Sequence, residues 1–290
     1  MALPTQPGQK QDKLDAFIDL VHHLPPSPRL LVKLLEVFKQ PDPDINEVVK
    51  LISHDPSFTV EVLKRCNSAF FAGDKPAENM FEAVSRLGFQ EIYQIIMAMF
   101  AATAILKPGT GGGAHVDILW RHSVAVAVAS GVLATEAGES NAAAFTAGLL
   151  HDIGKVVMVS ADRDKYAEAV LNSGMFGRPV VVTEKELFGF DHAEVGARLL
   201  MRWNFPLNIV AAVLHHHRLE GAESFERIAA IIHLSNMLAH GTGEKLAGTP
   251  QGLQNAAVSM AVLQLVPDKI TTLLPSMQQG LEKAKATMPG

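Results

Sequence analysis

Apolar side chains recur at the three- and four-residue spacing of α-helices through most of this 290-residue chain. The dipeptides Ser27-Pro28 and Asp55-Pro56 each put a capping side chain before a proline, which is typical of a helix start. Because the apolar positions share one face in each segment, we predict helices that each bury one side. The clearest of these amphipathic segments are Leu30–Phe38, Ile45–Ile52 and Phe58–Ala69.

Patterns typical of strands are rare, and only Pro179–Thr183 is predicted to be extended. Gly88 is expected to close a helix over Met80–Leu87, before a longer and almost wholly apolar helix over Phe89–Leu106. The sequence therefore predicts an all-α fold of many helices. Further helices are predicted at about His115–Ala137, Asn141–Val159, Asp162–Leu171, His192–Trp203, Leu207–Arg218, Phe225–His240, Gln251–Leu265 and Asp268–Ala286.

A cluster of helix breakers at Lys107–Ala114 divides the chain, because it holds one proline and four glycines and no core-forming residue. We take this cluster as the junction between two helical halves. The predicted organisation is a flexible N-terminal segment over residues 1–20, an N-terminal helical half over 21–107, a Gly-rich junction over 108–114, a second helical half over 115–245 and C-terminal helices over 246–290.

Charge argues against a nucleic-acid partner. The chain has 25 basic and 30 acidic residues, and acidic residues are in excess on both sides of the junction. No basic half is available to bind a phosphate backbone. We therefore expect no nucleic-acid partner.

Cysteine content and hydropathy favour a cytoplasmic protein. The single cysteine, Cys66, allows no intrachain disulfide, and Met1–Gln11 is polar where a signal peptide would be apolar. The longest apolar runs without charge, Ile92–Leu106 and Ser123–Thr135, are shorter than the roughly 20 residues that a membrane span requires. We expect a cytoplasmic location and no membrane partner.

Histidines mark the second half as the candidate site, since nine of the twelve follow Gly113. The string His151-Asp152-Ile153-Gly154-Lys155 follows an apolar run, and a buried carboxylate is costly without a partner. A divalent cation would satisfy both His151 and Asp152, and Lys155 could then meet an anion such as a phosphate. A hydrogen-bonded structural pair is the alternative.

Further candidate ligands lie in separate predicted helices, namely His122, His192 and the run from His215 to His217. Adjacent helical residues project about 100° apart. His215 and His216 would therefore serve two neighbouring metal ions, or one of them would only support the other.

At this point the motifs resemble a known group, the HD superfamily of metal-dependent phosphohydrolases, and within it the HDOD family of bacterial signalling proteins. The resemblance covers roughly Leu24 to His240. The strings that carry it are Leu24-Pro25-Pro26-Ser27-Pro28, Ile52-Ser53-His54-Asp55-Pro56-Ser57-Phe58-Thr59, Cys66-Asn67-Ser68-Ala69-Phe70-Phe71, Ala83-Val84-Ser85-Arg86-Leu87-Gly88, His151-Asp152 and His233-Leu234-Ser235-Asn236.

The resemblance implies an HD-like helical second half with a metal site. Carried over by position, the implied ligands are His122, His151, Asp152, His192, His215 and His216. The distal aspartate of HD enzymes falls on Asn236, whose neutral amide is a weak ligand and a poor bridge between metals. The implied cofactors are one or two divalent ions of iron, manganese, nickel or zinc, or none.

Two functions remain open. The first is a signalling protein that works through a protein partner and keeps a degenerate HD site with or without metal. The Asn236 replacement and the lack of a Gly-Tyr-Pro motif after His216 favour it, and no pattern indicates a nucleotide ligand. The alternative is an active phosphohydrolase in which Lys155 stabilises charge on a phosphate. Whether the chain is an enzyme is thus left undecided, with the first function preferred.

Overall fold

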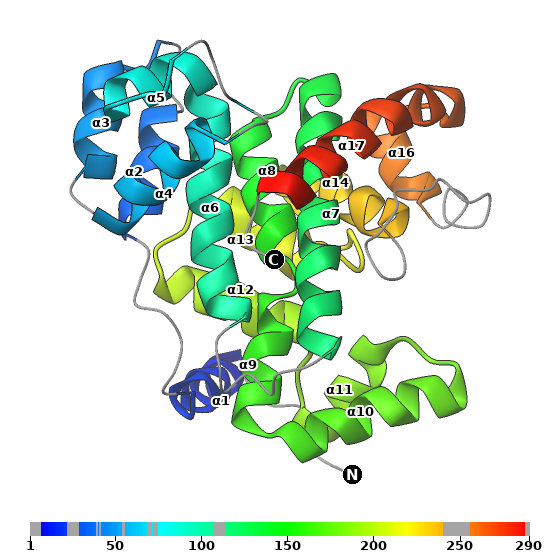
Figure 1. The fold of residues 1–290 in the computed structure, drawn as a ribbon. Coiled ribbons are helices and arrows are strands. Elements are labelled where there is room, and N and C mark those ends of the chain that lie inside the picture. Colours follow the sequence, from blue (N-terminus) through cyan, green and yellow to red (C-terminus); the bar gives the residue numbers. More distant parts are fainter. Residues whose placement is uncertain are drawn as a thin grey trace.

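Helices form every regular element in the part of the chain that the structure describes (Figure 1). This computed structural model describes residues 7–21, 29–38, 40, 42–53, 56–68, 71, 75–106, 114–239 and 256–287. The all-α prediction is confirmed. The helices are α1 (Pro7–Asp19), α2 (Arg29–Phe38), α3 (Ile45–Ser53), α4 (Pro56–Cys66), α5 (Met80–Leu87), α6 (Phe89–Ile105), α7 (Ala114–Ala137), α8 (Asn141–Leu150), α9 (Ile153–Ala161), α10 (Arg163–Phe176), α11 (Val180–Phe188), α12 (His192–Arg202), α13 (Leu207–His215), the short 3₁₀ helix η1 (Glu223–Phe225), α14 (Glu226–Leu238), α16 (Ala257–Leu263) and α17 (Pro267–Thr287).

The N-terminal helices α2 to α5 pack beside α6 at one end of the molecule (Figure 1). Gly88 ends α5 and begins α6 with φ of 79°, a conformation that glycine adopts without strain, and the two helices bend by 110° there. Asn67 closes the loop before α5, because its side chain accepts a hydrogen bond from the backbone N–H of Ala77 and donates one to the carbonyl of Ala77. The caps expected at Ser27-Pro28 and at Asp55 lie outside the described residues.

The two halves share one core. Helix α6 is buried almost all round and packs on α8. Across this contact the Tyr93 hydroxyl lies 2.6 Å from the Thr146 hydroxyl, and both side chains are buried. Residues 107–113 of the expected junction lie outside the described residues, and Ala114 is already the first residue of α7.

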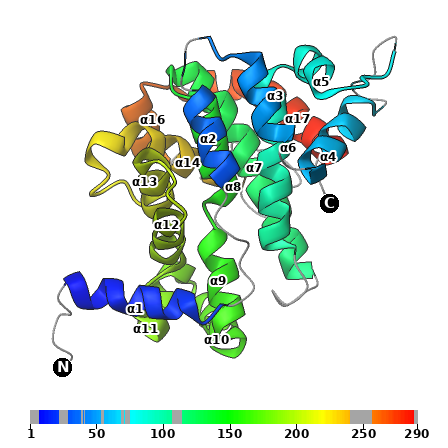
Figure 2. The same ribbon diagram turned by 90° about the vertical axis from the view of Figure 1, so that its left-hand side faces the viewer.

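Helices α7 and α8 make a close pair at the centre (Figure 2). A Cβ atom at Gly148 would stand 2.9 Å from the Cα of Ala127, so only glycine allows this approach. Helix α17 crosses α7 and reaches the N-terminal half, where Lys283 pairs with Glu91 of α6.

Two segments, Val116–Ala137 and Asn141–Ala161, have the length and apolar character to cross a membrane, and counting two bent helix pairs as single spans raises the number to four. These segments are longer than the charge-free runs seen in the sequence. Within them, 61% and 83% of the most apolar windows are buried inside the protein. Core packing therefore accounts for most of their apolar surface.

The expectation of a flexible segment over residues 1–20 is wrong for the described part, because Pro7–Asp19 forms α1. This helix packs against α12 and α9, with Leu14 and Ile18 buried and the Phe17 ring 4.9 Å from that of Phe190. Asp15 accepts a 2.9 Å hydrogen bond from Arg198 Nε on α12. No sequence pattern indicated this contact, because α1 is mostly polar and has only a few apolar residues on the face that docks.

The extended segment predicted at Pro179–Thr183 is also wrong, because Val180 begins α11. The valines favour strands only weakly, and tertiary packing overrides such a preference. Thr183 is fully buried and its hydroxyl donates to the carbonyls of Ala169 and Val180, which holds α11 against α10.

Candidate metal centre

Asp152 lies at the centre of a buried group of imidazoles, between the end of α8 and the start of α9. Its side chain is only 2% exposed. Oδ1 lies 3.2 Å from His192 Nε2 and 3.7 Å from His216 Nε2. Oδ2 lies 3.3 Å from His151 Nε2 and 4.0 Å from His122 Nε2. Four histidines from four helix regions thus turn the same nitrogen toward one carboxylate.

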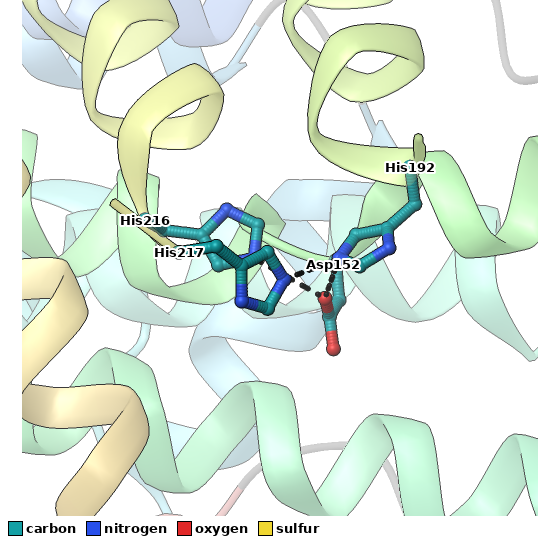
Figure 3. A group of neighbouring side chains, drawn as sticks. All are labelled: Asp152, His192, His216 and His217. Atoms are coloured by element: carbon teal, nitrogen blue, oxygen red, sulfur yellow. Dashed lines mark hydrogen bonds and ion pairs between the residues drawn. The ribbon is translucent and has the colours of Figure 1, made fainter. Parts of the chain in front are cut away.

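These side chains form two overlapping sets of possible ligands, and within each set the ligand atoms lie within 4.8 Å of one another. We call the first set the main site, and its histidines surround Asp152 in Figure 3. We call the second set the side site. The main site consists of Asp152, His192, His216 and His217, and the side site consists of His122, His151 and Asp152.

Backbone acceptors fix the orientation of the buried rings. His151 Nδ1 lies 2.8 Å from the Gly148 carbonyl, and His216 Nδ1 lies 2.7 Å from the Val213 carbonyl. Since a carbonyl only accepts, both Nδ1 atoms carry the hydrogen, and in the neutral ring the Nε2 lone pair faces Asp152. Metal-binding histidines in proteins are held in this way.

Three buried atoms at the centre have no hydrogen-bond partner among the described residues: His151 Nε2, His216 Nε2 and Asp152 Oδ1. An unsatisfied buried polar atom costs about 1–3 kcal/mol. All three are metal-ligand atoms, and imidazole nitrogen with carboxylate oxygen suits a divalent transition metal. The residues present therefore fit such an ion.

Two cations, Lys155 and His192, lie beside the buried carboxylate of Asp152. Burial would raise the pKa of Asp152, but His151 and Lys155 hold it well below its usual value. Lys155 Nζ lies 2.6 Å from Asp152 Oδ2. Although burial and Lys155 push the pKa of His192 down, Glu184 and Asp152 raise it to about 9. His192 is therefore protonated at neutral pH.

The rings of His216 and His217 stay neutral. Burial lowers the pKa of His217 to about 2, and burial also lowers the pKa of His216 well below its usual value. His192 Nε2 lies 2.8 Å from His217 Nε2, so protonated His192 donates and neutral His217 accepts. One proton thus lies between His192 Nε2 and His217 Nε2, two nitrogens that would both have to be free of protons to bind the same metal ion.

Asn236 contacts His122, which places it beside the side site. His122 donates from Nδ1 to the Ala239 carbonyl 3.1 Å away, and burial lowers its pKa to about 4, so its Nε2 carries a lone pair. The side-chain amide of Asn236 lies 2.9 Å from this Nε2. The atom nearest the ring is Oδ1, and two acceptors repel, so a hydrogen bond to the neutral ring requires the amide to exchange its oxygen and nitrogen, which leaves its shape unchanged.

The histidine pair of the centre is His216 and His217, whereas the sequence favoured His215 and His216. His215 belongs to neither ligand set. It faces the turn after α13, where its Cε1 lies 3.3 Å from the position of a Cβ built on Gly221. The buried face of α13 explains the difference. His216 follows the buried Ile209 by seven residues and His217 follows the buried Val213 by four, so both histidines continue the face that points into the protein.

Glu184 was not found from the sequence, although it is fully buried beside His192. Its Oε2 accepts from His192 Nδ1 at 2.7 Å and from the His192 backbone N–H at 3.0 Å. Burial, and after it the nearby charge of Glu184, raise the pKa of Tyr166 on α10 well above its usual value. A single glutamate directly after the segment expected to be extended gave no spacing signal, and only the helix α11 brings it to His192.

Gly154 explains how His192 comes so close to Asp152. A Cβ atom at Gly154 would stand 1.9 Å from the His192 carbonyl oxygen and 2.8 Å from the Gly196 backbone nitrogen. Helices α9 and α12 therefore pack backbone against backbone at this point. The glycine of the His151-Asp152-Ile153-Gly154 string thus sets the spacing of the centre.

Comparison with known families decides the classification of the chain. The pattern of the HDOD domain matches residues 24–219, more than half of the sequence. The chain belongs to the HDOD domain family. The matched region of this HDOD chain holds all the residues of the main and side sites, while Asn236 lies beyond it.

Curated relatives of this HDOD chain are longer proteins. An uncharacterized protein of Treponema pallidum is 27% identical over 229 residues, which are 78% of this chain and 44% of that protein. A Ribonuclease Y of Thermus thermophilus is 34% identical over 104 residues, which are 36% of this chain and 13% of that enzyme. The HDOD chain spans less than half the length of each relative.

Solved structures share the fold along nearly the whole chain. An HDOD domain protein with unknown function from Geobacter sulfurreducens has a TM-score of 0.73 at 21% identity, covering 96% of this chain and 99% of its own. A putative phosphohydrolase from Shewanella amazonensis has a TM-score of 0.68 at 25% identity, covering 95% of both chains. A putative signal transduction protein from Marinobacter aquaeolei has a TM-score of 0.75 at 18% identity, covering 97% of this chain and 66% of its own.

Proposed function

We propose that this HDOD protein is a bacterial signalling protein that acts by binding other proteins and holds one divalent transition metal at the main site. The observation that carries the proposal is the contact between Asn236 and His122. The amide lies 2.9 Å from His122 Nε2 and brings no charge where an aspartate would bring one, so the side site lacks the carboxylate that a second ion requires. The signalling role is supported by family membership and by the fold shared with the Marinobacter protein.

The residues proposed to hold the ion are Asp152, His192, His216 and His217. A bound divalent cation would supply Lewis acidity to a phosphate or a carbonyl group. Glu184 positions His192 through two hydrogen bonds, and Lys155 neutralises Asp152. Because the shared proton of His192 and His217 must leave when both nitrogens become ligands, metal binding should release a proton.

Metal analysis and turnover assays on the same preparations test this proposal. We expect one equivalent of iron, manganese, zinc or nickel per chain, lost in Asp152→Ala. With each metal ion present, we expect the unmodified protein to hydrolyse bis-p-nitrophenyl phosphate and cyclic dinucleotides no faster than the Asp152→Ala variant does. Turnover in the unmodified protein that disappears in Asp152→Ala would overturn the signalling proposal, and a metal content of zero after loading would overturn the metal site.

A second candidate is a metal-dependent phosphohydrolase. The similarity to the Shewanella protein along 95% of both chains favours it, as does Lys155 one helical turn from His151. In that function Lys155 would leave Asp152 to meet the phosphate, and Lys155→Met would abolish turnover while metal stays bound. The match to Ribonuclease Y covers only 13% of that enzyme, and the chain has more acidic than basic residues, which does not favour RNA as a substrate.

A further inference from the structure

Helix α10 exposes an apolar face that no described part of the chain covers. Leu171 is 65% exposed and Met175 is 76% exposed, beside the exposed Val170. Ala167 and Gly174 complete this face, and a Cβ atom at Gly174 would meet nothing within 4 Å. We call these five residues the α10 face.

The spacing of the α10 face is that of a helix-packing surface. Ala167, Val170, Leu171, Gly174 and Met175 occupy positions i, i+3, i+4, i+7 and i+8. The opposite side of α10 already packs inward, with Ala169 fully buried and Tyr166 close to Glu184. Helix α10 is therefore apolar on two sides. The chain itself buries the side with Ala169 and leaves the α10 face exposed.

We propose that the α10 face binds the α10 face of a second copy of this chain, with the two helices antiparallel and Leu171 at the two-fold axis. Asp164 precedes Leu171 by seven residues and Arg178 follows it by seven. An antiparallel pair centred on Leu171 therefore brings Asp164 of each copy to Arg178 of the other. The face is thus complementary in charge to itself, as a two-fold interface requires.

Side-chain size agrees with the same arrangement. In the antiparallel pair, Ala167 of one copy faces Met175 of the other, so a small residue meets a large one. Gly174 offers no side chain and lets the partner helix approach closely. The helices α10 and α11 form one end of the molecule, away from helices α2 to α5 (Figure 1).

Arg178 is placed to pair with a second copy. It follows the end of α10, its guanidinium lies 5.3 Å from the Phe176 ring, and it makes a bidentate ion pair with Glu186 at 2.7 and 3.0 Å. This support holds the guanidinium near the helix end while its side chain stays 39% exposed. Asp164, in the first turn of the exposed helix, is the matching anion.

Sedimentation equilibrium of the whole chain tests the proposal, with Leu171→Asp and Leu207→Asp compared over a wide range of protein concentration. Leu207 is a matched control, because it is 63% exposed at the start of α13 and lies outside the α10 face. We expect dimers in the unmodified protein and in Leu207→Asp, and a dimer dissociation constant at least about tenfold higher in Leu171→Asp. A monomer at all concentrations, or a dimer that Leu171→Asp leaves unchanged, would overturn the proposal.

Cysteine cross-linking tests the two-fold geometry. The native Cys66 is buried, so Leu171→Cys supplies the accessible thiol. We expect Leu171→Cys to form a disulfide-linked dimer under mild oxidation, and Arg163→Cys to form none, because in the antiparallel pair the two 163 positions stand about 24 Å apart along the helix axes. A disulfide at position 163 with none at 171 would exclude the antiparallel pair. Circular dichroism of each variant verifies that the fold is intact.

Discussion

His192 donates its Nδ1 hydrogen to Glu184 across 2.7 Å, and neither side chain is exposed to solvent. Glu184 also accepts from the backbone N–H of His192, so one carboxylate fixes both the ring and the first residue of α12. The orientation of a main-site ligand therefore depends on a residue of another helix.

Replacing Glu184 should weaken metal binding more than it weakens the fold. In Glu184→Gln the amide keeps the size of the side chain but removes the charge that orients His192, so we expect metal affinity to fall by about 10- to 100-fold. Isothermal titration with Mn²⁺ or Zn²⁺ measures the change. Glu186→Gln, an exposed position on the same helix, is the control. Equal affinity in both variants would show that Glu184 does not position the ligand.

A methyl group at Gly154 should disrupt the centre by pushing apart two helices. The added Cβ would overlap the His192 carbonyl oxygen, so Gly154→Ala is expected to cost about 3 kcal/mol of folding free energy or more. Ser160→Ala is the control, because it changes a single atom of a half-buried side chain near the other end of the same helix α9. Urea unfolding measures both variants. A Gly154→Ala protein as stable as the unmodified one would contradict the close packing of α9 and α12.

Acid should release α1 from α12. The hydrogen bond from Arg198 holds the pKa of Asp15 below its ordinary value of 3.8, and partial burial opposes this shift only in part. Because the folded pKa is the lower one, the stabilisation is complete above pH 3.8 and is lost as the pH falls through the folded pKa. Hydrogen exchange of the α1 amides should therefore accelerate in acid relative to the core. Asp15→Asn should show fast exchange at neutral pH as well, and unchanged exchange in this variant would refute the role of the ion pair.

Restoring a carboxylate at position 236 should strengthen metal binding. Asn236→Asp places a charge 2.9 Å from His122 Nε2, beside the side site, so we expect tighter binding of Mn²⁺ and a second equivalent of metal at saturation. Titration with elemental analysis measures both. Asn236→Leu, which removes the amide without adding charge, is the control. If Asn236→Asp binds metal no better than the unmodified chain, residue 236 has no influence on the ions.

Helical periodicity predicted most helices because it records burial directly, as in Leu34 and Ile52, which are fully buried on the predicted faces. It missed α1, whose docking depends on Phe17 and on the pairing of Asp15 with a residue 183 positions away. Sequence motifs led to His122, His151, Asp152, His192 and His216, and the structure brings these side chains together.

The remaining features of the centre could not come from a linear pattern. The main site contains His217 and not the predicted His215, because the orientation of α13 about its axis decides which residues of the histidine run face Asp152. Glu184 reaches His192 only through the packing of α11, whose first turn was predicted to be extended. Both depend on the relative placement of helices, which local sequence does not specify.

The backbone contact at Gly154 makes the separation of Asp152 and His192 a property of the main chain. Side chains around a site are often repacked to widen or narrow it, but here no side chain lies between the two helices at the point of contact. The two backbones that carry Asp152 and His192 therefore cannot move closer or apart through repacking of the side chains at this contact. A change of metal preference, in nature or in the laboratory, is therefore expected to come from exchanging the ligands themselves.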